Sequence, residues 1–320
     1  MRWGVLGAAN FAKQHMAPAI HAAKGAELYA LATSSPKKAA GFQAFAPGLV
    51  IHDSYDALLA DPMIDAVYIP LPNHLHVEWS VKALEAGKHV LCEKPMTLAA
   101  PEFDQLIAAR DKAGKLAAEA FMIVHHPQFA RARELVQAGA IGALRHVDVV
   151  FSFNNSAETD NIRNKPGTGG GGLFDIGVYA FGAARFVTGE EPQSIDFARI
   201  DYENDVDVFV QTVARFPGFS YGATISMRLA TRQYITFHGD TGWLTLPAPF
   251  NAGVYQQAEL MLEQGTTRTV ERWPAANHYV LQVEAFERAA AGQETYACPL
   301  EFSRGTQAMI DGVFDAGGRP

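Results

Sequence analysis

The stretch RWGVLGAANFA, residues 2–12, decides the fold of the first part of the chain. Arg2–Leu6 is a short apolar run typical of a buried strand, Gly7 follows it directly, and a helical pattern starts at Ala12. A glycine turn between a strand and a helix lets backbone amides approach a pyrophosphate at the helix N-terminus. We therefore expect a dinucleotide-binding turn, with contacts from Gly7, Ala9, Asn10, Phe11 and Ala12.

The turn departs from the usual G-x-G-x-x-G pattern, because alanine stands at positions 9 and 12. On the motif alone, a tight strand-to-helix turn without a ligand remains the alternative. Its position and the pattern that follows favour a binding turn. Up to about residue 120, apolar strands alternate with amphipathic helices, as a parallel sheet with helical crossovers requires. The expected strands are Arg2–Leu6, Glu27–Ala32, Ala66–Ile69, His89–Cys92 and Leu116–Ala120, and the expected helices are Ala12–Ala23, Pro36–Phe45, Tyr55–Ala60, His74–Ala86 and Pro101–Lys112.

After residue 145 the apolar period changes to two, which is typical of antiparallel strands joined by turns such as Pro217-Gly218 and Gly239-Asp240. The expected strands are His146–Phe153, Asp205–Phe216, Phe219–Leu229, Tyr234–His238 and Trp243–Leu246, with helices at Pro127–Ala138, Leu173–Thr188 and Tyr279–Ala291. The fold predicted is α/β. It has an N-terminal Rossmann dinucleotide-binding domain (1–120) and a C-terminal α+β domain (121–320) with a largely antiparallel open sheet. The second domain would bind substrate and support oligomerisation, and its C-terminal helix could pack back on the first.

Composition agrees with two globular domains: 320 residues, 48% hydrophobic and 19% charged. A net charge of −8 with scattered lysines and arginines argues against nucleic acid as a partner. Two cysteines, Cys92 and Cys298, cannot form a disulfide framework and indicate a reducing compartment. We find neither a signal peptide nor a membrane-length apolar stretch, so we expect a cytoplasmic protein with no membrane partner. Neither the cysteines nor the adjacent His125-His126 pair has metal-ligand spacing, so no metal is expected.

The end of the second expected strand bears on the choice of cofactor. NAD-preferring sites commonly place an acidic residue there for the ribose hydroxyls, and this chain has none. Ser34 with Lys37 or Lys38 could instead bind a 2′-phosphate, which favours NADP(H) and leaves NAD(H) open. The alternative is that Ser35 caps the next helix, Pro36 occupies its first position and the lysines are solvated.

From Tyr55 to Pro95 the sequence resembles the glucose-fructose oxidoreductase / inositol dehydrogenase (Gfo/Idh/MocA) family almost without interruption. The matching segments are YDALL (55–59), DP (61–62), IDAVYI (64–69), PNHLH (72–76) and AGKHVLCEKP (86–95), followed by AFM (120–122), HP (126–127) and GGGLFDIGVY (170–179). The resemblance covers both domains and is closest to the tyrosine-containing sugar and dihydrodiol dehydrogenase branch. One departure is Ile123-Val124, where close sugar-dehydrogenase relatives tend to have Tyr-Arg.

The resemblance implies a catalytic, substrate-contacting and cofactor-contacting lysine at Lys94, at the carboxyl edge of the sheet. It also implies a second catalytic element at Asp175 and Tyr179, which we expect to contact substrate. Four-residue spacing on a helix places these two side chains on one face, and a nearby ammonium would favour the phenolate as an acid/base. The alternative for Tyr179 is a packed aromatic.

Further cofactor contacts are expected from Pro72, Asn73, His76 and Glu93, although Asn73 or His76 could cap the next helix instead. Arg163 could reach substrate oxygens or face solvent. The glycine run 169–172 could allow close backbone approach or form a flexible link.

The activity implied is an NAD(P)-dependent dehydrogenase or reductase that moves a hydride between nicotinamide and a carbinol or carbonyl of a sugar or related small polyol. Two other functions stay open: an NAD-dependent glycoside-cleaving enzyme of the same fold, and a non-catalytic dinucleotide sensor. An antiparallel sheet with one face to cover favours a homodimer or homotetramer.

Overall fold

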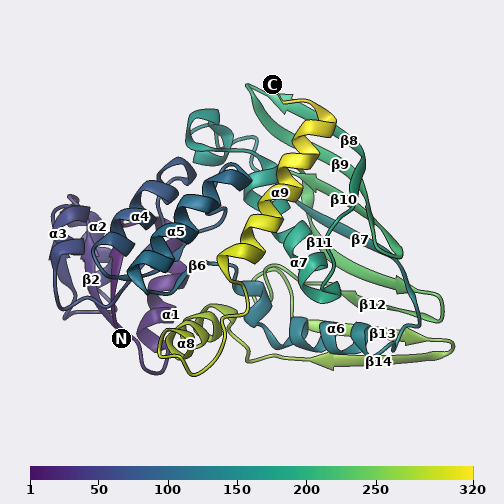
Figure 1. Cartoon of the computed structure of the whole chain (residues 1–320), viewed down its shortest axis with the longest axis horizontal. Helices are drawn as coiled ribbons and strands as arrows, with labels where there is room; N and C mark the ends of the chain where they lie inside the picture. The colour runs from purple at the N-terminus through teal and green to yellow at the C-terminus, as the bar shows by residue number, and fades with distance from the viewer. Residues whose placement is uncertain (320) are drawn as a thin grey trace. The chain divides into compact units, whose positions relative to one another are not determined.

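A computed structural model describes residues 1–319, and the chain divides into two compact units (Figure 1). The first unit comprises Met1–His125 together with Asn277–Arg304, and the second comprises His126–Ala276 and the chain from Gly305 onward. The domain boundary expected between residues 120 and 121 stays a prediction. In residues 1–319 no helix combines the length and the apolar character that a membrane span needs.

The first unit contains a six-stranded parallel sheet in the order β3-β2-β1-β4-β5-β6, which is the doubly wound order. Its strands are β1 (Arg2–Leu6), β2 (Glu27–Ala32), β3 (Val50–His52), β4 (Ala66–Ile69), β5 (His89–Cys92) and β6 (Ala117–Glu119). The inner strands are almost wholly buried because helices cover both faces. The expected Rossmann fold is confirmed.

Local sequence explains where the helices of this unit begin and end. Ser35 and Ser54 cap α2 and α3 by accepting a hydrogen bond from the amide three residues on, and Gly114 ends α5 in the left-handed conformation. The helical elements are η1 (Ala12–Met16), α1 (Ala17–Ala22), α2 (Pro36–Gln43), α3 (Tyr55–Ala60), η2 (Asn73–Leu75), α4 (His76–Glu85), η3 (Ala100–Glu102), α5 (Phe103–Ala113), η4 (Met122–His125) and α8 (His278–Ala290).

Helix α8, although distant in sequence, belongs to the core of the first unit. Phe286 packs on the fully buried Trp3 with ring centroids 5.1 Å apart, and the indole N–H of Trp3 donates to Glu287 at 2.7 Å. A tryptophan at the start of the central strand is therefore covered only after the chain returns.

The second unit contains an eight-stranded sheet in the order β14-β13-β12-β11-β7-β10-β9-β8. Its strands are β7 (Leu144–Asn154), β8 (Ser194–Glu203), β9 (Val206–Phe216), β10 (Phe219–Ser226), β11 (Arg228–Gly239), β12 (Gly242–Leu246), β13 (Glu259–Gln264) and β14 (Thr267–Arg272). All neighbours are antiparallel except β7 and β10, which run parallel; parallel strands need a long crossover, and here the connection contains a helix and the strands β8 and β9. The expected largely antiparallel sheet is confirmed.

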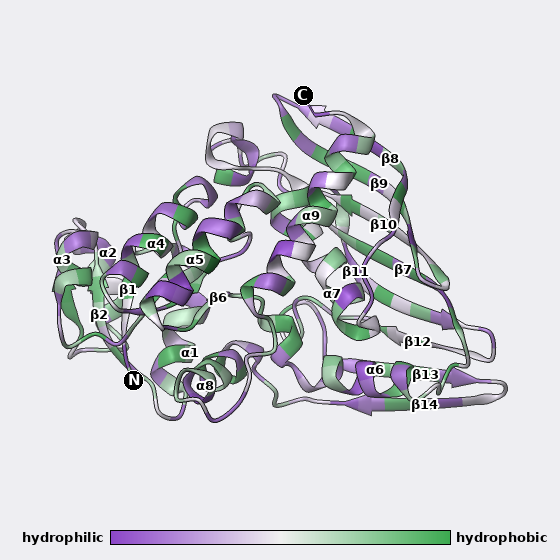
Figure 2. Cartoon of the chain, in the orientation of Figure 1, coloured by the Kyte–Doolittle hydropathy of each residue, from purple (hydrophilic) through white to green (hydrophobic). Residues whose placement is uncertain are grey.

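Helices line one face of this sheet, among them α6 (Pro127–Gln137) and α7 (Val178–Thr188), with η7 (Leu173–Gly177) leading into α7 (Figure 1). Helix α9 (Leu300–Gly317) begins in the first unit and continues into the second, where Phe314 packs on Phe174 at 5.4 Å. The strands carry both hydropathic colours in Figure 2, as expected for a sheet buried on one face.

The sequence pattern was wrong at one strand and silent at several elements. Phe219–Leu229 is not one strand: β10 ends at Ser226 and β11 begins at Arg228, with the buried Met227 donating its amide to Val208 O at 2.9 Å. Ser226 Oγ accepts from the amide of Arg228 at 3.0 Å, which closes the corner. Among the strands and α-helices, those not foreseen are β3, β8, β13, β14 and α9.

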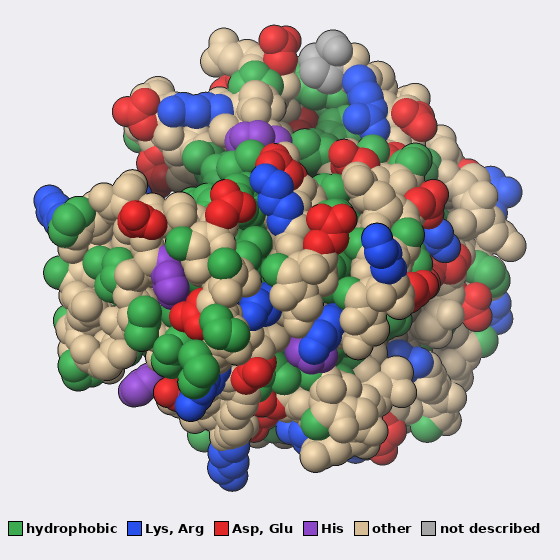
Figure 3. All heavy atoms as spheres, turned by 60° about the vertical axis from the view of Figure 1, so that its left-hand side comes forward, with side chains coloured by type: hydrophobic (Ala, Val, Ile, Leu, Met, Phe, Trp, Pro, Cys, Tyr) green, Lys and Arg blue, Asp and Glu red, His purple; other side chains and the backbone are tan. Residues whose placement is uncertain are grey.

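Acidic and basic side chains are interspersed on the face drawn in Figure 3, and neither sign forms a continuous block there. Many charged side chains of the described residues are paired, as in Arg2 with Glu27 at 3.2 Å and Lys82 with Glu78 at 2.6 Å. Over residues 1–319, that face therefore has no continuous positively charged patch that would attract a polyanion.

Replacing Phe286 by alanine should lower the free energy of unfolding by about 3–5 kcal/mol, because a cavity would open beside Trp3. Urea denaturation followed by tryptophan fluorescence measures the loss. The exposed Met63→Ala in the same unit is the control and should change stability by about 0.5 kcal/mol or less. Equal stabilities for the two variants would show that α8 is dispensable to this core.

Candidate active site

The turn after β1 has the shape that a pyrophosphate requires. Gly7 has φ +108°, and a Cβ there would lie 3.0 Å from Leu71 Cδ2 and 3.3 Å from Tyr55 Oη. Helical backbone starts at Asn10, and the first amides of a helix have no partner within it. The amides that follow Gly7 thus gather at the carboxyl edge of the sheet, where this fold places a dinucleotide. The residues of the turn fit such a cofactor.

Phe11 holds this turn from the side. Its ring lies 5.0 Å from that of His15 and 5.8 Å, edge-on, from that of Tyr279 at the start of α8. Burial raises the pKa of Tyr279, with the nearby charge of Glu93 adding to the effect. Sequence reasoning missed Tyr279, because nothing local connects residue 279 with residue 11.

At the end of β2, Ser34, Lys37 and Lys38 are exposed. Ser35 caps α2 by accepting from the amide of Lys38 at 3.3 Å, and it donates its own amide to Thr33 Oγ1 at 3.2 Å. The helix cap considered from the sequence is therefore present. The two lysine side chains stand outside it, at the first turn of α2.

The segment after β5 is held by two carboxylates, the half-buried Glu93 and the buried Glu119. Tyr68 donates its hydroxyl to Glu93 Oε1 at 2.6 Å, and the amide of Lys94 lies 3.4 Å from Glu93 Oε2. Burial raises the pKa of Glu93, against the effect of the Tyr68 hydrogen bond and the Lys94 charge. Two residues further on, the amide of Met96 donates to Glu119 Oε1 at 2.8 Å. The backbone on both sides of Lys94 is therefore fixed, while Lys94 itself is half-buried.

His76 braces this segment from within the protein. It is fully buried, with Nδ1 2.7 Å from Pro95 O and Nε2 2.7 Å from Leu71 O. Burial lowers the pKa of His76 to about 4. The side chain thus ties these two loops together and does not cap α4, and its expected contact with the cofactor stays a prediction. Its neighbours Pro72 and Asn73 are half-buried.

In the second unit the structure brings together three residues expected at the substrate. Arg163 Nε donates to Asp175 Oδ2 at 2.7 Å, and Asp175 precedes Tyr179 by one helical turn. The side chain of Arg163 is 41% exposed and that of Asp175 is 13% exposed. The charge of Asp175 raises the pKa of Arg163, and Tyr179 adds to the effect.

Tyr179 is largely buried against an aromatic wall. Phe151 and Phe250 stack with centroids 4.7 Å apart, and the Tyr179 ring lies 6.0 Å from each of them. The phenol therefore belongs both to a polar cluster and to an apolar surface. The sequence expectation of a packed aromatic and that of a functional phenol are both compatible with this placement.

The glycine run 169–172 approaches the protein's own polar groups. A Cβ on Gly170 would lie 2.6–2.8 Å from the carbonyl oxygens of Arg163, Lys165 and Ile162. A Cβ on Gly171, which has φ +126°, would overlap the carboxylate of Asp207. The run is therefore not a flexible link, because its backbone packs where side chains would not fit.

Asp207 on β9 anchors the start of the helix that carries Asp175 and Tyr179. Its Oδ2 accepts from the amide of Leu173 at 2.7 Å, and the amide of Gly172 also donates to this carboxylate. Burial raises the pKa of Asp207 from 3.8 to about 7. Sequence reasoning missed this residue, since a single aspartate in a strand pattern carries no local signal.

These features define a class of two-unit protein. Its Rossmann unit has a turn suited to a dinucleotide, and its α+β unit has a cluster of a phenol, a carboxylate and a guanidinium. Two family models match the chain: an oxidoreductase family with an NAD-binding Rossmann fold over residues 1–121, and the Gfo/Idh/MocA C-terminal domain over residues 129–245. The chain belongs to the Gfo/Idh/MocA oxidoreductase family, as its motifs suggested.

Relatives and solved structures agree over nearly the whole chain. An uncharacterised oxidoreductase of Rhizobium meliloti is 37% identical, covering 98% of this chain and 96% of its own. The NADP-dependent D-xylose 1-dehydrogenase 2 of Haloferax volcanii is 33% identical over 99% of this chain and 97% of its own. A 3-ketoreductase from Actinomadura kijaniata, crystallised with NADP and TDP-benzene, superposes with a TM-score of 0.90 at 31% identity, covering 99% of this chain and 97% of that one.

The raised pKa of Asp207 predicts a specific pH dependence. The folded protein binds the proton of Asp207 more tightly than the unfolded chain does. The stabilisation of the folded state by this proton is therefore complete below about pH 4, decreases between about pH 4 and pH 7, and does not change further above pH 7. Asp207→Asn removes this slope, which is on the order of 1 kcal/mol per pH unit at most.

Urea titrations between pH 4 and 8 should therefore show that the free energy of unfolding of the variant increases relative to that of the wild type as the pH rises. The exposed neighbour Asp205→Asn serves as control and should run parallel to the wild type. Parallel curves for Asp207→Asn as well would mean that this carboxyl ionises as freely as an exposed one.

Proposed function

We propose that this enzyme transfers a hydride between NADP(H) and a carbinol or carbonyl of a sugar or related small polyol, and that Tyr179 and Lys94 carry the proton and charge chemistry. The observation that carries the proposal is the Arg163–Asp175–Tyr179 cluster in a member of this oxidoreductase family. Relatives named as sugar dehydrogenases and dTDP-sugar 3-reductases support the substrate class.

The first unit would hold the dinucleotide. Pyrophosphate would lie on the amides after Gly7, with Ala9, Asn10, Phe11 and Ala12 forming the turn. Ser34, Lys37 and Lys38 would receive a 2′-phosphate, which agrees with the absence of an acidic side chain there and with NADP in the related structure. Pro72, Asn73 and Glu93 would line the nicotinamide end, and His76 would act by bracing Pro95. We assign residues 1–120 to the cofactor and 121–320 to substrate and oligomerisation.

When bound, nicotinamide supplies or accepts the hydride. For oxidation, Tyr179 would take the proton of the substrate hydroxyl, and Lys94 would stabilise negative charge on that oxygen. Asp175 would hold Arg163 in place through their 2.7 Å hydrogen bond, and Arg163 would present its remaining donors to substrate oxygens. The aromatic wall of Phe151 and Phe250 would exclude water behind the phenol.

The Actinomadura enzyme gives independent support for the two central residues. It has also been crystallised with one lysine replaced by alanine and with one tyrosine replaced by phenylalanine. Those two positions are separated by nearly the same number of residues as Lys94 and Tyr179.

Lys94→Ala and Tyr179→Phe should each lower kcat by at least about 100-fold while leaving the Kd for NADPH within a few-fold of the wild type. Turnover is measured as NADP⁺ reduction over a panel of pyranoses and polyols, and cofactor binding by NADPH fluorescence. Lys24→Ala and Tyr29→Phe, away from this site in the first unit, are the matched controls.

Near-normal turnover in either variant would remove that residue from the mechanism. NADPH binding without turnover on any substrate of the panel would point to a dinucleotide sensor. Net glycoside hydrolysis without accumulating reduced cofactor would point to the glycoside-cleaving alternative. The cytoplasmic location expected from the two cysteines, both of which are buried, stays a prediction.

We propose further that the open face of the eight-stranded sheet joins two copies of the chain, as a homodimer or as part of a homotetramer. Phe197 pairs with Val213 and Val213 with Gly222 across three neighbouring strands, which places these residues on one face. Trp243 lies on the same face of β12, and the three large side chains are 41–51% exposed. Apolar side chains in a row around a glycine suit a flat partner of the same kind.

Replacing both Phe197 and Trp243 by glutamate should convert the oligomer into monomers, because two copies would bring four carboxylates together at the contact. Sedimentation velocity at micromolar concentration measures the mass. The loop variant Val254→Glu, at a still more exposed apolar residue outside the strands, should leave the assembly intact. A monomeric wild type at that concentration would refute the proposal.

A further inference from the structure

The segment 155–172 between β7 and η7 carries Arg163 but does not belong to the sheet. It consists of the short turns η5 (Ile162–Asn164) and η6 (Pro166–Thr168) and the glycine run. A segment of this kind holds a side chain in place only if polar contacts fix its backbone. Some of the polar contacts that fix this backbone come from residues outside the segment.

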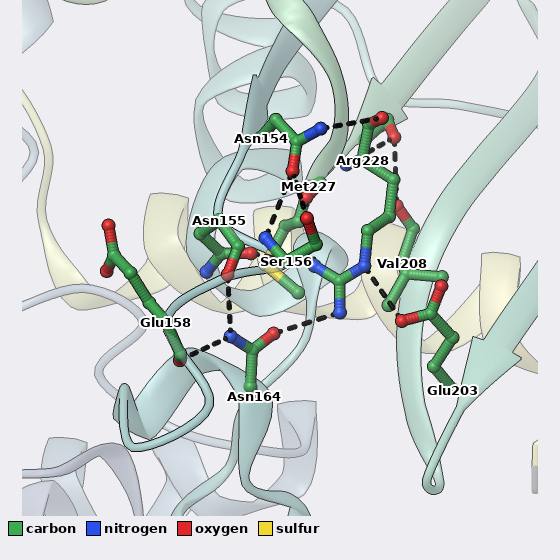
Figure 4. A network of polar contacts seen from close by, with 10 residues as sticks. Asn154, Asn155, Ser156, Glu158, Asn164, Glu203, Val208, Met227 and Arg228 are labelled. Atoms are coloured by element: carbon green, nitrogen blue, oxygen red, sulfur yellow. Dashed lines mark hydrogen bonds and ion pairs between the residues drawn. The ribbon is translucent and has the colours of Figure 1, made fainter.

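Arg228, at the start of β11, contacts the segment through its guanidinium group (Figure 4). Its Nη1 donates to Asn155 Oδ1 at 2.7 Å and to Met227 O at 2.9 Å, and its Nη2 donates to Asn164 Oδ1 at 3.1 Å. Its Nε donates to Glu203 Oε2 at 2.8 Å, and the side chain is 19% exposed. One planar group thus contacts both ends of the stretch 155–164.

Asn164 transmits this contact to the backbone of the segment. While its oxygen accepts from Arg228, its amide nitrogen donates to Asn155 O at 3.3 Å and to Glu158 O at 3.0 Å. Figure 4 shows the asparagine lying between the guanidinium and these two carbonyls. The stretch is therefore closed into a loop around one side chain, and that side chain is oriented by Arg228.

Arg163 is the residue next to Asn164, and its own backbone is held from the other side. Its amide donates to Asn161 Oδ1 at 3.0 Å, and its carbonyl accepts from the amide of Gly171 at 3.0 Å. Its side chain then reaches Asp175. The path from Arg228 to the ion pair thus runs through one asparagine and one peptide bond.

We propose that Arg228 is a positioning residue for the reaction: through Asn155 and Asn164 it sets Arg163 against Asp175 and Tyr179. The role depends on the planar fork of the guanidinium, which contacts the two asparagines through two different nitrogen atoms, whereas a lysine has its donors on a single nitrogen atom. This inference rests on the proposed function for its effect on turnover, but the tether itself can be tested without any substrate.

The tether is tested by limited proteolysis with trypsin, which cleaves after arginine. Cleavage of the Arg163–Asn164 bond, followed by mass spectrometry, should be at least about 10-fold faster in Arg228→Met than in the wild type. Arg145→Met is the matched control, since it removes an exposed, ion-paired arginine at the other end of β7. Equal cleavage rates at this bond in all three proteins would overturn the tether.

The effect on the reaction is tested with Arg228→Met, Arg228→Lys and Asn164→Ala. Each should lower kcat by about 10- to 100-fold, with the Kd for NADPH unchanged, because the loss is one of orientation. The rise of kcat with pH should move to higher pH, since a displaced Arg163 no longer favours the phenolate of Tyr179. Combining Arg228→Met with Asn164→Ala should cost little more than either alone.

Failure of the proposed function and failure of the positioning role of Arg228 give different experimental results. A wild type without turnover on any sugar would defeat the proposed function, while faster trypsin cleavage in Arg228→Met would still uphold the tether. Faster cleavage together with unchanged kcat and an unchanged pH profile would show that the tether exists but does not position the reacting groups, which would overturn the proposal. Full activity in Arg228→Lys would overturn the role of the guanidinium fork.

Discussion

The second unit depends on one buried carboxylate. Asp207 accepts amides from the first residues of the helix that carries Asp175 and Tyr179, at the end where a helix has free N–H groups and partial positive charge. The glycine run is required because the backbone must come within contact distance of that carboxylate. The start of the helix, the loop before it and the ion pair of Arg163 follow from this contact. Loss of the carboxylate would leave buried amides without a partner, which is costly.

The first unit uses the same principle around Lys94. Glu93, Glu119 and His76 fix the backbone before and after the lysine through hydrogen bonds to peptide groups and to the Tyr68 hydroxyl. In both units the backbone beside the proposed reacting groups is held by buried polar side chains, whose geometry is more specific than that of apolar packing. Such networks fix orientation closely, but each member must keep its partner.

How much of this could be predicted depended on whether the signal was local. Strands β1, β2, β4 and β5 and helix α3 lie where apolar runs, prolines and caps placed them. Strands β8 and β14 were missed because they owe their structure to pairing within the sheet and carry many exposed side chains. Among the site residues, Arg163, Asp175 and Tyr179 were expected and lie in one cluster. Asp207 and Arg228 were not, since each contacts the loop from 34 or more residues further along the chain.

The first unit is built from two separate stretches of the chain, because the chain returns to it at Asn277. The family model for the Rossmann part ends at residue 121, but the core of that unit is completed only by Phe286 and Glu287 against Trp3. A fragment cut after residue 120 would expose an indole and a face of β1 that the intact chain covers. Transfer of the whole dinucleotide-binding unit between relatives, in evolution or by gene fusion, must therefore move two stretches of coding sequence together.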